Sequence, residues 1–380
     1  MTIAPTPPMG WNSWNMFGAT VNAEVIKQTA DSFISSGLKN AGYEYIVIDD
    51  IWHGGRGTDG KLFPDKQKFP DGMKSVADYL HARGLKFGMY SDAGPLTCGG
   101  RPASQDHEEI DAATFAEWEI DYLKYDWCHA EDTRANAEYR YKRMADALRA
   151  TDREIIFSIC EWGHHSPWRW GEKVGGNLWR TTGDIGDSWQ DVFNSWGILY
   201  GIESIGFEQQ RGLEQYAGPS HWNDPDMLVV GLRGTSREIY GAGCTDTEYR
   251  THFSLWCMLA APLMIGCDIA NMDAATHEIL TNKEVIALNQ DPLGKQGWRA
   301  SRHSQTEIWK KPLADGALGV ALFNRGERTK TVRAHWSDLE ISGNYSIRDL
   351  WAHTERGTSD TEFTADVSAH GCVVLKLQPT

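Results

Sequence analysis

One pattern recurs along the chain from Met9 to about residue 290. Each unit is a short apolar strand, a loop rich in Trp, Asp and Gly, and an amphipathic helix. Eight such units in about 270 residues predict a (β/α)8 barrel, also called a TIM barrel. The predicted strands cover residues 9–14, 43–50, 85–92, 120–126, 154–162, 178–185, 221–227 and 262–269. A doubly wound sheet is the alternative, but it usually has a Gly-rich phosphate-binding turn between a strand and a helix, which we do not expect here.

Two of the predicted helices have recognisable N-terminal ends. Asn22 is a good N-cap for a helix over residues 23–36, and Asp71 for a helix over residues 70–84. Ile34 belongs to the apolar stripe of the first helix, so we expect its side chain to be buried.

The pattern changes after about residue 295. Short β-type segments then alternate with tight turns, and Asp315-Gly316 is typical of a hairpin turn. The sequence therefore predicts two domains, a barrel over residues 1–295 and an antiparallel β-sandwich over residues 296–380. We expect the sandwich to pack on the barrel and to carry no catalytic cluster.

Charge and hydropathy argue against several classes of partner. The chain has 37 basic and 52 acidic residues, a net charge of −15, which disfavours nucleic acid and anionic membrane surfaces. Its longest apolar run, residues 255–267, contains Pro262 and is shorter than the roughly 20 residues of a membrane span. It predicts a buried helix that runs into a strand. The first residues contain neither a basic region nor an apolar core, so we expect no signal peptide in this chain.

The segment 120–126 places charged side chains on one face of a predicted strand. Because side chains alternate along a strand, Tyr122, Lys124 and Asp126 point one way, whereas Leu123 and Tyr125 point the other. Lys124 is close enough to keep the carboxylate of Asp126 ionised. An ionised aspartate at the end of a strand suits an enzyme that attacks its substrate with a carboxylate. A purely structural ion pair is the alternative.

Acidic residues follow most of the predicted strands, where the reacting groups of a (β/α)8 barrel lie. They are Asp49, Asp50, Asp92, Asp126, Glu161, Asp184, Asp187, Asp224 and Asp226. A metal centre would need histidines at ligand spacing, and only His53 and His221 lie nearby. A site that binds a cation or polyol without chemistry is a second alternative. We favour glycoside hydrolysis, which uses two carboxylates beside a sugar. Arg180 is expected to position Asp184, the alternative being a surface salt bridge.

Six segments at these strand ends resemble glycoside hydrolase family 27, the α-galactosidase family of clan D. They are MGWNSW (9–14), IDDIW (48–52), YLKYDWC (122–128), CEWG (160–163), WRTTGDI (179–185) and WNDPDM (222–227). In addition, LNQDPLGKQG (288–297) is similar to the end of the family's barrel. The resemblance covers nearly the whole chain. It implies a (β/α)8 barrel with a C-terminal β-sandwich, which agrees with the pattern of the residues.

The resemblance implies a role for two aspartates. Asp126 would attack the anomeric carbon and form a covalent glycosyl-enzyme. Asp184 would first protonate the leaving oxygen and then deprotonate the incoming water, so that the anomeric configuration is retained. Such a mechanism places the two carboxyl groups roughly 5–5.5 Å apart.

The resemblance also implies a set of sugar-binding residues. They are Trp14, Asp49, Asp50, Tyr90, Lys124, Cys160, Trp162, Arg180 and Asp226. Asp49 and Asp50 would hold the 4- and 6-hydroxyls, and Lys124 would reach the 3- and 4-hydroxyls. The sequence Cys160-Glu161-Trp162 is similar to the galactosidase form rather than to the form that admits N-acetylgalactosamine.

The cysteines depart from the pattern of many secreted relatives. The chain has seven, and Ile51 stands where those relatives have a cysteine of an N-terminal disulfide. Cys98 and Cys128 match another family disulfide and are the candidate pair here. Cys160 lacks its usual partner, so we expect a free thiol that faces the sugar. Few disulfides and no signal peptide favour a cytoplasmic location, although a mature secreted form would look similar.

The activity implied by the resemblance is that of a retaining exo-α-galactosidase, which removes terminal α-linked D-galactose from oligosaccharides or galactomannan. A β-L-arabinopyranosidase of the same family is one alternative. A catalytically inactive sugar-binding protein is an alternative from a different class. No cofactor or metal is expected, because the acid pair carries the whole reaction. The sequence leaves the oligomeric state open.

Overall fold

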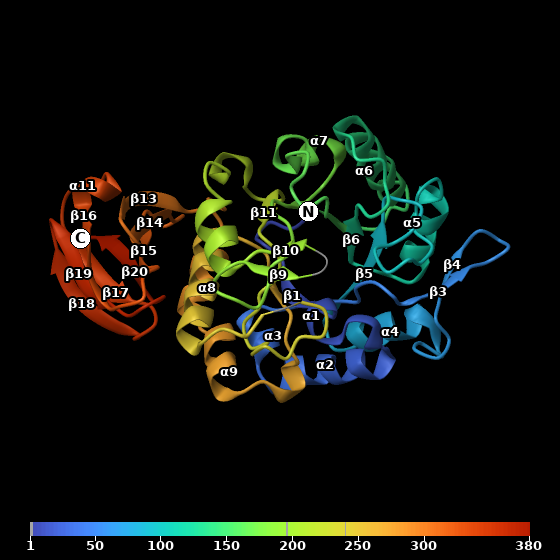
Figure 1. Cartoon of the computed structure of the whole chain (residues 1–380), viewed down its shortest axis with the longest axis horizontal. Coiled ribbons are helices and arrows are strands. Elements are labelled where there is room, and N and C mark those ends of the chain that lie inside the picture. Colours follow the sequence, from blue (N-terminus) through green and yellow to red (C-terminus); the bar gives the residue numbers. More distant parts are fainter. Residues whose placement is uncertain (1–2, 195–196, 240) are drawn as a thin grey trace.

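The N-terminal part of the protein is a closed barrel of parallel strands surrounded by helices (Figure 1). The structure, a computed structural model, describes residues 3–194, 197–239 and 241–380. The strands pair in the order β11-β8-β7-β6-β5-β2-β1-β12. A bridge between Leu228 and Ile265 joins the segment after β11 to β12 and closes the ring. The strands are β1 (Met9–Asn12), β2 (Tyr45–Val47), β5 (Lys86–Asp92), β6 (Tyr122–Asp126), β7 (Ile156–Ile159), β8 (Leu178–Arg180), β11 (Trp222–Asp224) and β12 (Leu263–Ile265).

The predicted barrel is confirmed, and every one of its predicted strands is present, although each is shorter than expected at one or both ends. The longer helices are α2 (Ala23–Ser35), α4 (Gly72–His81), α5 (Glu108–Glu117), α6 (Arg134–Arg149), α8 (Asp246–Met258), α9 (Ala274–Leu280) and α10 (Lys283–Asn289). Single turns of helix form α1 (Trp14–Phe17), α3 (Leu38–Ala41), α7 (Gly171–Val174) and α11 (Trp336–Leu339). The predicted continuation of a buried helix into a strand is α8 followed by β12.

The helix-capping predictions had different outcomes. The Asn22 side chain accepts the Val25 N–H at 3.0 Å and begins α2, as predicted. Asp71 occupies the N-cap position of α4, as predicted, but its side chain makes no cap hydrogen bond. Its backbone is not extended as a capping residue requires. Ile34 is 44% exposed, contrary to expectation, because it lies at the edge of the apolar stripe that Phe33 buries.

Two segments depart from the repeated pattern. Between β8 and β11 the expected helix is replaced by a hairpin of β9 (Val192–Asn194) and β10 (Gly197–Leu199) and by the π-helical turn η3 (Glu203–Glu208). Residues 55–61, GRGTDGK, match the glycine spacing of phosphate-binding loops, contrary to our expectation that no such turn occurs. They lie in the hairpin of β3 (His53–Arg56) and β4 (Leu62–Pro64), not between a strand and a helix.

Alternation along the strands separates the barrel interior from the layer beneath the helices. On β6, Leu123 and Tyr125 join the core that packs against the helices, whereas Tyr122 joins a separate core inside the barrel. Lys124 and Asp126 follow Tyr122 on the inner face and reach a pocket at the carboxyl end. The predicted alternation is therefore confirmed.

The C-terminal part is the predicted antiparallel β-sandwich. One sheet contains β13 (Trp298–His303), β14 (Thr306–Pro312), β15 (Leu318–Asn324), β20 (Cys372–Pro379), β17 (Tyr345–Asp349) and β18 (Thr354–Ser359), and the other β16 (Lys330–His335) and β19 (Glu362–Val367). Gly316, with φ +81°, forms the predicted turn between β14 and β15. The domain boundary at residues 295 and 296 stays a prediction.

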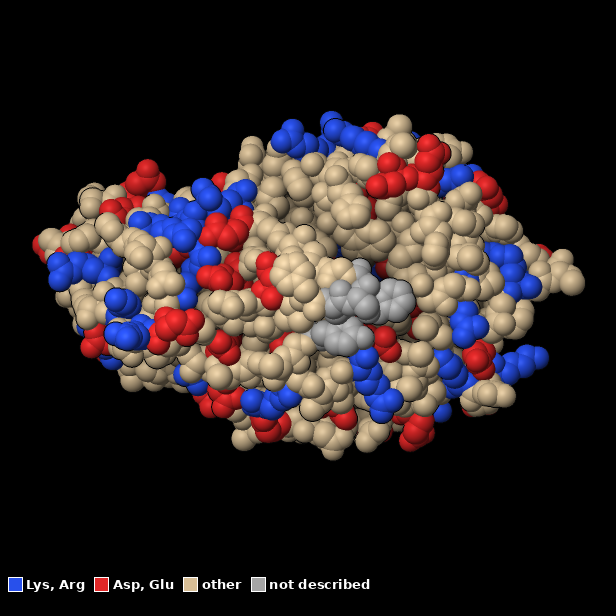
Figure 2. All heavy atoms as spheres, in the orientation of Figure 1, with Lys and Arg blue, Asp and Glu red and all other residues tan. Residues whose placement is uncertain are grey.

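The sandwich packs beside α8, and charged residues join it to the barrel (Figure 1). Arg325 of the sandwich contacts Glu203 at 2.9 Å and Glu208 at 2.5 Å, both from η3, and Glu307 at 2.7 Å. On the face shown in Figure 2, Lys and Arg lie among Asp and Glu rather than in one basic patch. Within the described residues, no helix combines the length and the hydropathy that crossing a membrane requires.

The two capping positions predict a difference in stability. Asn22→Ala should lower the free energy of unfolding by about 1 kcal/mol, because the Val25 amide loses its acceptor. Asp71→Ala should change it by less than about 0.5 kcal/mol, because no cap hydrogen bond is lost. Chemical denaturation of both variants measures the difference, and equal losses would contradict the assignment of the caps.

Candidate active site

A pocket of about 90 Å³ opens at the carboxyl ends of the barrel strands. Every residue predicted to bind or transform a sugar lines it: Trp14, Asp49, Asp50, Tyr90, Lys124, Asp126, Cys160, Trp162, Arg180, Asp184 and Asp226. A larger hollow of about 610 Å³ lies at the opposite end of the barrel, among the starts of the strands. Its Lys86 and Arg153 are paired with Glu44 and Asp121, so we assign the chemistry to the smaller pocket.

Lys124 neutralises a different carboxylate from the one that the sequence suggested. Its Nζ lies 2.9 Å from Oδ2 of Asp49, which also accepts a hydrogen bond from Asn12 at 2.6 Å. Burial opposes the charge on Lys124, but its neighbours, Asp49 first among them, together outweigh burial and hold the lysine pKa well above its usual range. Lys124 therefore acts on Asp126 through space rather than as its direct partner.

Asp126 is buried and firmly held. The Tyr90 hydroxyl donates to its Oδ2 at 3.0 Å, and the Trp127 N–H donates to its Oδ1 at 3.0 Å. Burial raises the pKa of Asp126 to about 6, against the opposing effect of Lys124, and the charge of Asp184 adds to the rise. We expected Lys124 to keep the carboxylate of Asp126 ionised, without a rise in its pKa. The pKa is raised instead, but it stays below 7, so Asp126 is mainly ionised at neutral pH.

Arg180 holds two acids at the mouth of the pocket. Its Nη2 lies 2.9 Å from Asp184 Oδ1 and 3.1 Å from Asp226 Oδ2. Arg180 is only 3% exposed, so the alternative of a surface salt bridge is wrong. The side chain of Asp184 is 53% exposed, which leaves it open to water and to a bound molecule. The Ile185 N–H donates to Asp226 at 2.9 Å and ties the two loops together.

Asp50 is fixed by backbone amides from two segments. Its Oδ1 accepts the Ile51 N–H at 2.6 Å, and its Oδ2 accepts the Gly99 N–H at 2.7 Å. Burial raises the pKa of Asp50, and the Gly99 and Ile51 amides oppose this rise. Both amides therefore orient the carboxylate, and the Thr97 hydroxyl also opposes the rise in its pKa.

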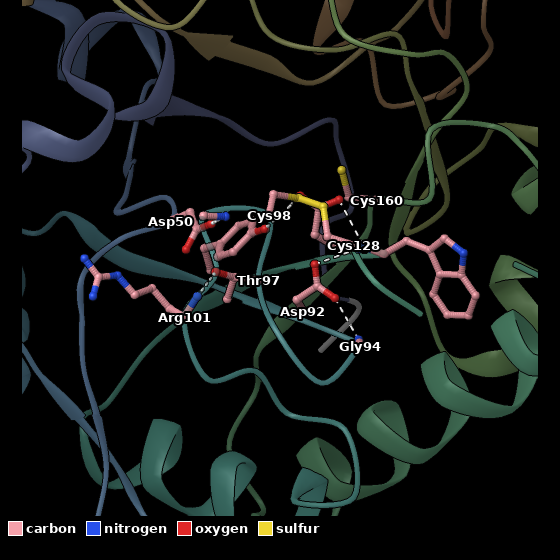
Figure 3. Close-up of a disulfide and its surroundings, with 12 residues drawn as sticks. Asp50, Asp92, Gly94, Thr97, Cys98, Arg101, Cys128 and Cys160 are labelled. Atoms are coloured by element: carbon pink, nitrogen blue, oxygen red, sulfur yellow. Dashed lines mark hydrogen bonds between the residues drawn. A yellow bond between two sulfur atoms is a disulfide. The ribbon is translucent and has the colours of Figure 1, made fainter. Parts of the chain in front are cut away.

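A disulfide joins Cys98 to Cys128 beside the pocket (Figure 3). Sγ of Cys98 lies 3.4 Å from the Tyr90 hydroxyl. Cys160 is a buried free thiol whose sulfur accepts a hydrogen bond from Arg180 at 3.7 Å. Within the described residues, Asp92, Cys98, Asp126 and Cys128 form a group with metal-ligating atoms close together, but its two sulfurs are bonded to each other. The absence of a metal requirement stays a prediction.

Four of the acids at strand ends lie outside the pocket lining, contrary to expectation. Asp92 and Asp187 each accept a backbone N–H from another loop. Glu161 and Asp224 accept one from His165 and Asp226 in their own loops. Burial raises the pKa of Glu161 to about 8, so it is protonated at neutral pH. Cys160 and Trp162 line the pocket, whereas Glu161 between them does not; all three residues follow the end of β7 at Ile159. These acids shape the loops around the pocket.

The pocket also contains residues that the sequence analysis missed. They are Asn15, Met227 and Ile239, and the lining also includes Cys98, which the sequence predicted as a disulfide partner but not as a lining residue. Asn15 and Met227 each follow a predicted site residue directly, and this adjacency could have indicated them. Ile239 lies in a long irregular loop, where no periodic pattern marks an inward side chain.

The barrel and its acid-lined pocket define a glycoside hydrolase. The family model described as Alpha galactosidase A matches residues 6–291, and the model described as Alpha galactosidase C-terminal beta sandwich domain matches residues 303–377. The chain therefore belongs to the α-galactosidase family, glycoside hydrolase family 27.

Relatives along the whole chain agree with this assignment. The chain is 46% identical to alpha-galactosidase A of Cellvibrio japonicus over 99% of this chain and 93% of the relative. It is 44% identical to the alpha-galactosidase of Cyamopsis tetragonoloba over 99% and 87%. The crystal structure of alpha-galactosidase I from Mortierella vinacea superposes with a TM-score of 0.94, at 36% identity, over 100% of this chain and 98% of that one.

These comparisons also decide between the alternatives. A β-L-arabinopyranosidase from Geobacillus stearothermophilus is only 26% identical, with a TM-score of 0.85 over 99% of this chain and 97% of that one. The full-length α-galactosidase relatives are much more similar. The chain is an α-galactosidase, and the arabinopyranosidase and the inactive sugar-binding protein are both disfavoured.

The raised pKa of Asp126 predicts a pH-dependent gain in stability when its charge is removed. Above pH 6 the folded protein carries a buried carboxylate at a cost of about 3 kcal/mol, whereas in the unfolded chain this carboxyl ionises above its ordinary pKa of 3.8. The protonated carboxyl group therefore contributes its full stabilisation of the folded protein below pH 3.8. This stabilisation is lost as the pH rises through 6.

Asp126→Asn should therefore raise the melting temperature at pH 7.5, and the gain should disappear near pH 4. Asp106→Asn is the control. The Arg140 hydrogen bond lowers the pKa of this exposed residue, so removing its charge should lower the stability at pH 7.5 rather than raise it. Calorimetry at both pH values measures the effect. An Asp126→Asn variant no more stable than wild type at pH 7.5 would contradict the raised pKa.

Proposed function

We propose that the α-galactosidase works by double displacement, with Asp126 as the nucleophile. The observation that carries this proposal is a buried, mainly ionised carboxylate held on both oxygens at the end of β6. Asp126 attacks the anomeric carbon and displaces the leaving group, which gives a covalent galactosyl-enzyme. Water then attacks the same carbon from the opposite face and releases Asp126, so the product keeps the configuration of the substrate.

Asp184 is the acid/base in this proposal. It protonates the glycosidic oxygen in the first step and removes a proton from water in the second. Its exposed side chain supports this role, because the leaving group departs and water arrives on the open side of the pocket. Arg180 holds the carboxylate in position during both steps.

The remaining pocket residues select galactose. Asp49 and Asp50 accept hydrogen bonds from the 4- and 6-hydroxyls, Lys124 donates to the 3- and 4-hydroxyls, and Trp14 packs against the ring. The pocket therefore selects sugars whose 4-hydroxyl is axial, because an equatorial 4-hydroxyl leaves these buried groups without partners.

The substrate in this proposal is a terminal α-linked galactose of an oligosaccharide or of galactomannan. A pocket rather than an open groove supports removal of one terminal unit. The Saccharomyces cerevisiae relative was solved with raffinose, a galactose-containing oligosaccharide, which supports this class of substrate.

The cellular compartment is a separate proposal. The low number of disulfides led us to expect a cytoplasmic enzyme. The exposed Cys98–Cys128 bridge supports the mature secreted form instead, because such bridges persist in oxidising compartments.

Hydrolysis of p-nitrophenyl α-D-galactopyranoside, with the released sugar followed by NMR, tests the proposed mechanism. Wild type should release α-galactose first, and Asp126→Ala should lose at least about 10³-fold in kcat, because the covalent step is removed. Adding azide to Asp126→Ala should give β-galactosyl azide, because azide enters from the face that the carboxylate left.

The β-L-arabinopyranoside and the α-N-acetylgalactosaminide serve as comparison substrates. Faster hydrolysis of either would show that the sugar pocket is assigned incorrectly. Initial release of β-galactose by wild type would refute the retaining mechanism.

A further inference from the structure

A turn beside the pocket has an exposed tip. Leu96 and Pro102 form an antiparallel bridge at its base, and residues 98–101 at its tip are exposed. Thr97, where the tip begins, is buried. Because little surface is buried at the tip, its position depends on a few specific contacts (Figure 3).

Two such contacts lie next to each other in the sequence. Cys98 is bonded to Cys128, and the next residue, Gly99, donates its N–H to Asp50 Oδ2 at 2.7 Å. The fit around Gly99 is close, since an added Cβ would lie 2.9 Å from that oxygen and 2.7 Å from the Ile51 side chain. The disulfide therefore fixes Cys98, the residue directly before the one whose amide contacts Asp50.

The far end of the bridge is anchored in the barrel. Asp92 Oδ2 accepts the Cys128 N–H at 2.8 Å, and its Oδ1 accepts the Gly94 N–H at 2.7 Å, where the turn segment leaves β5. The bridge thus connects the exposed tip to a well-anchored part of the site. If the bridge opens and the Gly99 amide moves away, the remaining amide contact of Asp50 comes from Ile51, the next residue in the sequence.

We infer that the Cys98–Cys128 disulfide sets the selectivity of the pocket for sugars that carry a 6-hydroxyl. It does so by holding the Gly99 amide against Asp50, the carboxylate that the proposed function assigns to this hydroxyl. The inference rests on that proposed function. When the bridge opens, Asp50 loses its second amide and with it the orientation that the 6-hydroxyl requires. The hydrolysis of a sugar that lacks the 6-hydroxyl is affected little.

The bridge is accessible to chemistry. Cys98 is exposed, so a dithiol reductant such as dithiothreitol can reach its sulfur. Reduction transfers two electrons and two protons to the bridge, which leaves thiols on Cys98 and Cys128, and the reductant becomes a cyclic disulfide.

The test compares two substrates of the whole enzyme, p-nitrophenyl α-D-galactopyranoside and its 6-deoxy analogue, p-nitrophenyl α-D-fucopyranoside. The ratio of their kcat/KM values should fall about tenfold on reduction of wild type, and equally in Cys98→Ser/Cys128→Ser. The reductant should not change the ratio in the double variant. Gly99→Ala, with the disulfide intact, should lower the ratio to a similar extent.

Gly100→Asn is the matched control. A Cβ at this position meets nothing within 4 Å, and asparagine tolerates the φ of +73°, so the ratio should not change. An unchanged ratio after reduction and in Gly99→Ala, or equal losses on both substrates, would overturn the inference. Hydrolysis of neither substrate by oxidised wild type would instead refute the proposed function itself.

Discussion

The site depends on two cations, the partly buried Lys124 and the buried Arg180, which allow several carboxylates to share one small pocket. Asp49, Asp126 and Asp226 are nearly inaccessible to water, and burial alone would favour their neutral forms. Lys124 lies against Asp49, and Arg180 lies between Asp184 and Asp226. Both cations oppose the rise in acid pKa values, and the pKa of Asp126 stops at about 6. A charged nucleophile at neutral pH is therefore a property of the whole cluster.

Local periodicity predicted much of this arrangement, because strand alternation is a local rule. It correctly placed Lys124 and Asp126 inside the barrel. The ion-pair partner of Lys124 could not be predicted, because Asp49 follows β2, which is separated from β6 by β5, and local alternation does not give contacts between strands. Likewise, the sequence does not separate the aspartates that hold loops from those in the pocket, because both groups lie at the ends of strands. Only the three-dimensional contacts of Asp92 distinguish it from Asp126.

The sandwich contributes to the site through the barrel loops. Arg325 binds Glu203 and Glu208 at the two ends of η3. Shortly after η3, the Gln210 amide oxygen accepts a hydrogen bond at 3.1 Å from the hydroxyl of Thr181, which follows Arg180 in the sequence. A chain of specific contacts thus runs from the sandwich to the cation that holds Asp184. This arrangement gives the second domain a physical role in shaping the site, beyond the burial of apolar surface.

The central claim is that Asp126 becomes covalently attached to the sugar, and trapping that intermediate tests it most directly. An activated 2-deoxy-2,2-difluoro α-galactoside forms the glycosyl-enzyme faster than it is hydrolysed, because fluorine destabilises the oxocarbenium-like transition state of the second step. Intact-mass and peptide mass spectrometry should find one added sugar per chain, on the peptide that contains Asp126, and none in Asp126→Asn. A label on any other residue, or an unlabelled enzyme that still turns the compound over, would contradict the account.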